Sequence, residues 1–248
     1  MTQLEEAVRL APGSSSPHYA LATLLLSEKR FEDAKTHFNA AIRLKPDFSE
    51  AYNNLGVMSY AQGNLDAAIA NYAAALRLEP GNAQARHNLG RALASQGKFD
   101  EATVEYRRVL KARPDDADTL SSLASVLTSR GQIDEAVSHY RRALELNPNL
   151  TSALIDLAWI LATSARADIH APQEAVRLAE RVATLTKFEN ATVMDALAVA
   201  YFSAGRTADA IRALQAAIDV ASRTGLEGLA DHFRQRLESY KRALQGLP

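Results

Sequence analysis

Hydrophobic residues recur three and four positions apart along most of this chain, with polar residues between them. Tyr52 and Leu55 show this spacing in one stretch, and Ala68 and Tyr72 show it again a few residues later. Such spacing gathers apolar side chains on one face of an α-helix. Gly63 lies between the two stretches, where a left-handed residue would end the first helix. The pattern therefore predicts a hairpin of two amphipathic helices.

The predicted hairpin repeats with a period of 34 residues. Prolines recur at this interval at Pro12, Pro46, Pro80, Pro114 and Pro148, and columns of small, alanine, aromatic and glycine residues share it. Proline cannot continue the hydrogen-bond ladder of a helix, so each of these prolines ends a second helix. Repetition at a fixed period of this length is typical of solenoids, in which stacked units share a continuous core.

With these columns the chain resembles the tetratricopeptide repeat family over residues 15–150. The pattern changes after residue 150 but continues, and before residue 15 only the columns of a second helix are present. The expected divisions are a partial repeat at 1–14, full repeats at 15–48, 49–82, 83–116 and 117–150, an irregular repeat at 151–190, a sixth repeat at 191–224, and a C-terminal capping helix at 225–248. The resemblance implies an all-α fold, a right-handed α-solenoid of antiparallel helix pairs.

Local departures from the repeat pattern affect single turns and contacts. Lys29 stands where the turn glycine is expected, and Arg86 stands where a large apolar residue is usual. We expect a less tight turn at Lys29 and disturbed packing near Arg86, with the fold unchanged. In the irregular repeat the segment from Ser164 to Pro172 replaces the short turn, and Pro172 suits the first position of the next helix.

Charge and composition exclude several classes of function. Lysine plus arginine (28) nearly balance aspartate plus glutamate (29), and no basic stripe is present, which disfavours nucleic acid as a partner. The apolar runs are too short to span a membrane, so no direct membrane insertion is expected. The chain has no cysteine, its histidines lack metal-ligand spacing, and no nucleophile or phosphate-loop motif occurs. We therefore predict no catalytic activity, no cofactor and no metal.

The family resemblance implies that the first helices of the repeats line a concave groove. The residues that this register places there as candidates for binding a protein or peptide are Asn53, Asn54, Tyr60, His87, Asn88, Arg91, Ser122, Asp156, Trp159 and Asp195. Asn54 and Asn88 hold the same place in successive repeats, and an amide that donates and accepts together can grip an extended peptide backbone. The alternative is that both asparagines are common family sequence without a binding role.

The other candidates suggest the chemistry of the partner. His87 and Arg91 lie four residues apart and could bind an acidic group, or they could be solvated polar side chains. Asp118, Asp156 and Asp195 are expected to make the far half of the groove acidic, which favours a basic or neutral partner there. Trp159, the only tryptophan, is either a binding hot spot or a packing contact for the turn at 164–172.

The functional prediction is a protein–protein interaction scaffold that holds a peptide or protein segment in this groove. The alternative is the C-terminal recognition module of a larger membrane-associated glycosyltransferase-like protein, because residues 151–245 resemble the closing repeats of bacterial tetratricopeptide proteins. We expect the N-terminal half repeat to be a cut through a longer array, and its open face makes self-association a further expectation. The residues after Met1 include acids where a signal peptide would carry basic and apolar residues. We therefore expect a cytoplasmic location if Met1 is the native start, or a periplasmic or other extracytoplasmic one in the alternative.

Overall fold

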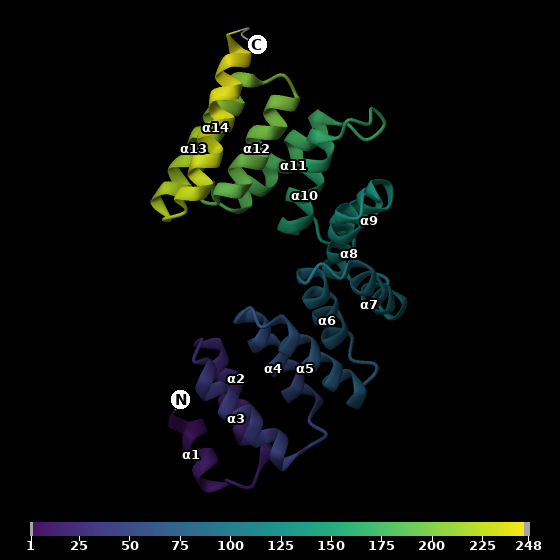
Figure 1. Ribbon diagram of the computed structural model, residues 1–248, viewed down its shortest axis with the longest axis vertical. Coiled ribbons are helices and arrows are strands. Elements are labelled where there is room, and N and C mark those ends of the chain that lie inside the picture. The colour runs from purple at the N-terminus through teal and green to yellow at the C-terminus, as the bar shows by residue number, and fades with distance from the viewer. Residues whose placement is uncertain (1, 246–248) are drawn as a thin grey trace. The chain divides into compact units, whose positions relative to one another are not determined.

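The computed structural model describes residues 2–245, and this part of the chain is built from α-helices joined by short turns, with no strand (Figure 1). The chain divides into two compact units, Met1–Pro114 and Asp115–Pro248. The boundary between them lies at Pro114, one of the prolines of the 34-residue column. The all-helical repeat fold that the sequence predicts is therefore confirmed.

The N-terminal unit contains a single helix followed by three helix pairs. The helices are α1 (Thr2–Leu10), α2 (Ser15–Ser27), α3 (Phe31–Leu44), α4 (Ser49–Ala61), α5 (Leu65–Leu78), α6 (Ala83–Ser95) and α7 (Phe99–Ala112). Helices α2 and α3, α4 and α5, and α6 and α7 pack as pairs, and α3 also contacts α4 as α5 contacts α6. Leu4 and Val8 of α1 pack against the core that α2, α3 and α4 share.

The C-terminal unit contains three helix pairs and a final long helix. The helices are α8 (Ala117–Ser129), α9 (Ile133–Leu146), α10 (Thr151–Thr163), α11 (Pro172–Leu185), α12 (Ala191–Ser203), α13 (Thr207–Arg223) and α14 (Glu227–Leu244). Helix α14 packs on α13 and buries Phe233, Leu237 and Tyr240. Leu226 and Leu244, at the two ends of this helix, are exposed. The covering face is therefore limited to the middle of α14.

The aromatic and small columns meet inside each helix pair. Tyr72 and Tyr106 are buried, and each ring lies against a glycine on the first helix of its pair. A Cβ atom added at Gly56 would lie 2.5 Å from the Tyr72 ring, and one added at Gly90 would lie 2.7 Å from the Tyr106 ring. Absence of a side chain at these two glycines thus lets the helices approach closely.

The first turn keeps its geometry although it lacks a glycine. Lys29 has φ 58°, a left-handed conformation, where Gly63 and Gly97 both have φ 76°. The backbone N–H of Arg30 donates to the Leu25 carbonyl at 2.9 Å, and the next turn makes the equivalent bond at the same length. The expectation of a less tight turn at Lys29 is wrong, because the helix pair imposes the left-handed conformation on a lysine.

Arg86 is accommodated by an ion pair instead of apolar packing. Its guanidinium donates to the Glu105 carboxylate at 2.7 Å and to the Pro80 carbonyl at 2.6 Å. Glu105 also accepts from Arg108 at 2.6 Å. Arg86 lies on α6 and Glu105 on α7, so the ion pair joins the two helices at the place where an apolar contact was expected.

The irregular segment between α10 and α11 is anchored to the unit. The Ala171 N–H donates to the Leu161 carbonyl at 3.0 Å, and Ile169 is buried. Arg166 extends from this segment to Asp134 on α9 at 2.8 Å and to Asp168 at 2.6 Å. Pro172 is the first residue of α11, as the sequence predicts.

Candidate binding site

Hydrogen bonds between amide side chains join the first helices of the N-terminal unit. Asn88 on α6 donates to Asn53 at 3.1 Å, Asn53 donates to Asn54 at 3.3 Å, and Asn54 donates to the Tyr19 hydroxyl on α2 at 3.1 Å. Gln84 completes the chain by donating to Asn88 at 3.2 Å. Asn88 is only 7% exposed. In this geometry the Asn88 amide links α6 to α4, and a role for it in gripping a peptide stays a prediction.

Tyr60 and Arg91 form a partly exposed pair on the same helices. The Arg91 guanidinium lies 4.6 Å from the centroid of the Tyr60 ring, a cation–π geometry, and Arg91 is exposed. The Tyr60 hydroxyl shares a hydrogen bond of 2.9 Å with Ser95, and this bond is the main cause that lowers the Tyr60 pKa. His87 instead lies 5.5 Å from the ring of Tyr106 on α7. Arg91 is thus paired with Tyr60, and His87 packs elsewhere.

The acidic residues predicted in the far half of the groove have different surroundings. Asp118 is exposed, with Ser122 donating to its backbone carbonyl at 2.8 Å. Asp156 is half-buried and accepts a hydrogen bond of 2.8 Å from the buried hydroxyl of Tyr140. Burial raises the pKa of Asp156, and the bond from Tyr140 opposes that rise.

Asp195 is buried beneath the C-terminal helix. It accepts a hydrogen bond from Arg236 on α14, and burial raises its pKa although the arginine acts in the opposite direction. Arg236 also shares a bond of 3.1 Å with His232. With Asp195 paired and Asp156 turned to Tyr140, only Asp118 of the three carboxylates is an exposed charge. The expected acidic surface is therefore reduced to Asp118 and the half-buried Asp156, and Asp195 does not contribute to it.

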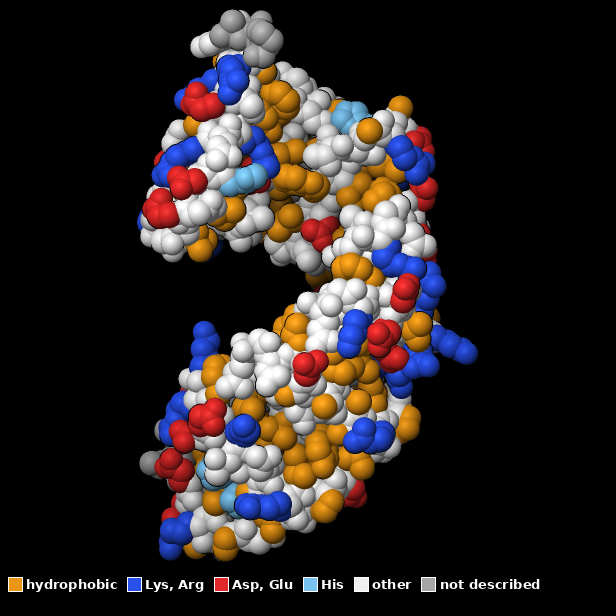
Figure 2. All heavy atoms as spheres, in the orientation of Figure 1, with side chains coloured by type: hydrophobic (Ala, Val, Ile, Leu, Met, Phe, Trp, Pro, Cys, Tyr) orange, Lys and Arg blue, Asp and Glu red, His pale blue; other side chains and the backbone are white. Residues whose placement is uncertain are grey.

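A cavity of about 660 Å³ lies where α10, α12 and α14 meet, and we call it the aromatic cavity. Its wall includes Trp159, His170, Phe202, Arg236 and Tyr240. Trp159 and Phe202 are each 37% exposed, and the Phe202 and Tyr240 rings are stacked with centroids 4.0 Å apart and planes 3° apart. The Arg236 guanidinium lies 5.4 Å from the Trp159 ring centroid. Figure 2 shows hydrophobic side chains gathered on the face that carries α12 and α14.

Sequence reasoning placed Trp159 on the binding surface but missed the contribution of α14. Arg236 and Tyr240 were assigned only to the capping helix, and their spacing of four residues was the one available sign that both side chains share a face. His170, from the irregular segment, contacts Ser203 at 3.5 Å and was also missed. The capping helix is therefore also part of the cavity wall.

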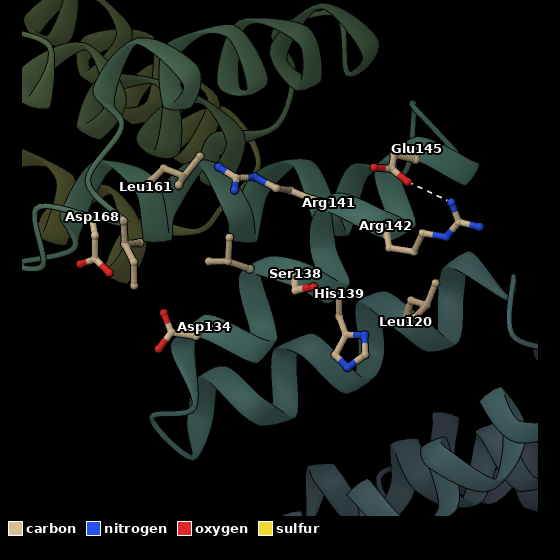
Figure 3. Close-up of a pocket in the computed structure, with 11 residues that line it drawn as sticks. Leu120, Asp134, Ser138, His139, Arg141, Arg142, Glu145, Leu161 and Asp168 are labelled. Atoms are coloured by element: carbon tan, nitrogen blue, oxygen red, sulfur yellow. Dashed lines mark hydrogen bonds and ion pairs between the residues drawn. The ribbon is translucent and has the colours of Figure 1, made fainter.

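A second cavity, of about 710 Å³, lies between α9 and the irregular segment (Figure 3). Its charged side chains are already paired. Arg141 contacts Glu174 at 3.0 Å, and Arg142 contacts Glu145 at 2.9 Å, a pair that Figure 3 shows. The wall itself also carries the carboxylates of Asp134, Glu145 and Asp168, so charges of both signs line this cavity and it offers little selectivity for a charged ligand.

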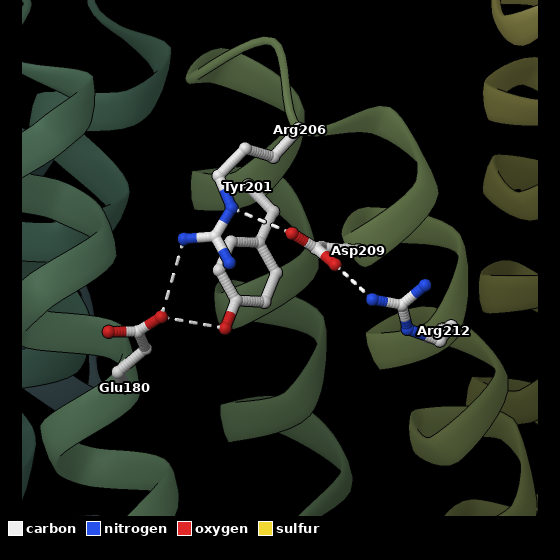
Figure 4. A network of polar contacts seen from close by, with 5 residues as sticks. All are labelled: Glu180, Tyr201, Arg206, Asp209 and Arg212. Carbon is white, nitrogen blue, oxygen red and sulfur yellow. Dashed lines mark hydrogen bonds and ion pairs between the residues drawn. The ribbon is translucent and has the colours of Figure 1, made fainter.

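A polar network ties the last repeats together (Figure 4). Tyr201 donates to Glu180 at 2.8 Å, and Arg206 contacts Asp209 at 2.7 Å while its guanidinium lies 4.2 Å from the Tyr201 ring centroid. Burial is the main cause that raises the Tyr201 pKa, to about 12. The network connects α11, α12 and α13 and is explained by packing between them.

Residues 2–245 contain no cluster of three or more histidine, aspartate or glutamate side chains that could hold a metal ion. None of the helices in this range combines the length and the apolar character needed to cross a membrane.

Comparison with known proteins identifies the repeats. Four family models, each described as tetratricopeptide repeat, match residues 19–83, 59–126, 117–150 and 190–224. No curated protein matches the sequence significantly.

Solved structures share the fold over most of the chain. Yeast Tom70 is 20% identical with a TM-score of 0.66, over 96% of this chain and 49% of Tom70. The APC/C hetero-tetramer Cut9–Hcn1 is 20% identical with a TM-score of 0.79, over 94% of this chain and 45% of the matched chain. This chain thus spans about half the length of both. YrrB, described as a tetratricopeptide repeat protein with an unusual peptide-binding site, is 25% identical with a TM-score of 0.57, over 80% of this chain and 97% of YrrB.

The helix pairs, the 34-residue columns and these matches agree. The chain therefore contains tetratricopeptide repeats and is an all-helical repeat solenoid, a fold that supports a role as a scaffold for protein interaction.

Proposed function

We propose that this protein is a non-catalytic scaffold that binds a peptide or an extended protein segment on the first helices of its repeats. One observation carries the proposal. In each unit an aromatic side chain on a first helix lies beside an arginine at a partly exposed place, Tyr60 with Arg91 and Trp159 with Arg236. Tyrosine, tryptophan and arginine are the residue types enriched at binding hot spots.

The comparisons support the same class of function. YrrB, at 25% identity, is described as having a peptide-binding site. Tom70 and Cut9–Hcn1 support the fold alone, since each is 20% identical to this chain. The glycosyltransferase-linked alternative, the compartment and self-association remain predictions, because no contact described above favours them.

Selection from a displayed library of random peptides on the immobilised protein tests the proposal. We expect the wild type to enrich a peptide family that the triple variant Tyr60→Ala, Arg91→Ala, Trp159→Ala does not retain. Val104→Ser, at an exposed apolar side chain of α7, is the control and should select the same peptides. Circular dichroism must show that both variants remain helical. If the triple variant keeps every selected peptide, the first helices are not the binding surface.

A further inference from the structure

We propose that the aromatic cavity binds a partner segment in which a large apolar side chain, preferably aromatic, is flanked by an acidic residue. This inference rests on the proposed function and specifies the chemistry of the partner. It reverses the expectation of a basic or neutral partner that the aspartates of this region suggested.

The wall of the cavity is suited to an apolar side chain. Trp159 and Phe202 expose parts of their rings, and the stack on Tyr240 fixes the plane of Phe202. A volume of about 660 Å³ lies within the range of pockets that enclose small ligands or several side chains. Aromatic rings prefer offset or edge-to-face contact with other rings, which adds to the free energy of burying apolar surface.

The charges of the cavity select the flanking residue. Among the described residues of its wall, Arg236 carries a positive charge and none carries a carboxylate. Asp195 does balance Arg236, but its side chain is 9% exposed against 20% for the arginine, so the carboxylate is the more deeply buried partner. A partner therefore meets the positive end of this pair. An acidic side chain is favoured there, and a lysine would be repelled.

A hydrogen-bond donor lies at the same place. The Tyr240 hydroxyl has no hydrogen-bond partner among residues 2–245, and burial is the main cause that raises its pKa to about 12. The hydroxyl consequently keeps its proton at neutral pH and can donate to an acceptor. A carboxylate or a peptide carbonyl supplies such an acceptor. Apolar rings, a guanidinium and a free donor thus converge on one type of partner segment.

Trp159 gives a direct measurement, because it is the only tryptophan of the chain and forms part of the cavity wall. The probes are three acetylated and amidated peptides, Gly-Glu-Phe-Glu-Gly, Gly-Lys-Phe-Lys-Gly and Gly-Glu-Ala-Glu-Gly, titrated to millimolar concentration. We expect the first to change the tryptophan fluorescence saturably. The lysine and alanine peptides should bind at least about tenfold more weakly, because the first lacks the acidic residues and the second lacks the aromatic side chain.

Two variants separate the cavity from general effects. Tyr240→Phe keeps the ring stack and removes the donor, and should weaken the first peptide about three- to tenfold. Phe188→Ser removes an exposed aromatic ring of the same unit that is outside the cavity wall, and should leave the affinity unchanged.

Three outcomes would overturn the inference. In the first, the lysine peptide binds as tightly as the glutamate peptide. In the second, the tryptophan fluorescence changes with protein concentration alone, which would show a second copy of the chain in the cavity. In the third, display selects peptides on the whole protein but no probe peptide changes the Trp159 fluorescence, so the inference fails and the proposed function stands. Should display also select nothing, both fail.

Discussion

Lys29 offers a test of how far the helix pair dictates backbone conformation. Its φ of 58° is left-handed, and five glycines of the described chain hold the same region with φ between 74° and 76°. A side chain in this conformation costs roughly 1–2 kcal/mol, because Cβ approaches the neighbouring carbonyl. Glycine avoids that cost but loses about 0.5–1 kcal/mol more conformational entropy on folding. Lys29→Gly should therefore stabilise the N-terminal unit by about 0.5–1 kcal/mol.

The reverse substitution is the matched control. Gly97 ends the first helix of another pair in the same unit with φ 76°, and a Cβ atom added there meets no atom within 4 Å. Gly97→Lys therefore adds backbone strain without a clash, and should destabilise by about the amount that Lys29→Gly gains.

Thermal unfolding of the intact protein followed by circular dichroism measures both changes. A difference of 1 kcal/mol shifts the midpoint by about 2–4 °C for a chain of this length. Amide hydrogen exchange in α2 and α3, and in α6 and α7, assigns each change to its helix pair, because separate parts of a repeat protein can open independently. If Gly97→Lys destabilises the protein while Lys29→Gly has no effect or destabilises it, the left-handed conformation of Lys29 does not strain the native protein.

Three further predictions concern polar side chains inside the helix pairs. Arg86→Ala should lower the free energy of unfolding in urea by about 1–3 kcal/mol. This is less than the loss for an isolated buried ion pair, because Glu105 keeps its contact with Arg108. Replacing both Arg86 and Glu105 by leucine should be nearly neutral, and an equal loss in the two variants would contradict the reasoning. Burial and a neighbouring imidazole lower the pKa of His37 in the folded protein. The unfolded chain therefore binds more protons as the pH falls below about 6.5, and wild type loses stability. His37→Gln should lose less of its urea midpoint than wild type between pH 7.5 and pH 5, and an equal loss in the two proteins would refute this. Tyr140→Phe should cost about 1–3 kcal/mol, since a half-buried carboxylate on α10 loses its donor, while Tyr72→Phe, which loses no observed hydrogen bond, serves as the near-neutral control.

The repeat itself could be predicted closely because each column answers a local requirement. First helices begin at Ser15, Ser49, Ala83, Ala117 and Thr151, at intervals of 34 residues, and the next begins at Ala191, after the irregular segment. Proline ends a helix because it lacks a backbone N–H, and glycine ends one because it adopts the left-handed conformation; both properties belong to the single residue and can be read from the sequence. The turn at Lys29 could not be predicted this way, because packing of the flanking helices overrides the local preference of one residue.

The binding site was less predictable because helical register gives the side of a helix and not what covers it. Asp195 was placed on the groove side, but its partner Arg236 comes 41 residues later on a helix assigned only to capping. Asn88 was likewise on the expected helix, but its amide donates to Asn53 of the preceding pair. These contacts join elements distant in sequence, and no position taken alone reveals them.

The same two positions of the helix pair hold different chemistry in different repeats. In the first repeat His18 and His37 meet with ring nitrogens 3.0 Å apart, and in the third Arg86 meets Glu105 at 2.7 Å. Both pairs are separated by 19 residues, which is fixed by the length of the hairpin. Physical complementarity across the pair, and not apolar character at each position, is therefore what the fold requires there. Taken alone, Arg86 looks like a packing defect. Glu105 lies 19 residues later in the sequence, at the position that faces Arg86, so the sequence already contained the partner of its ion pair.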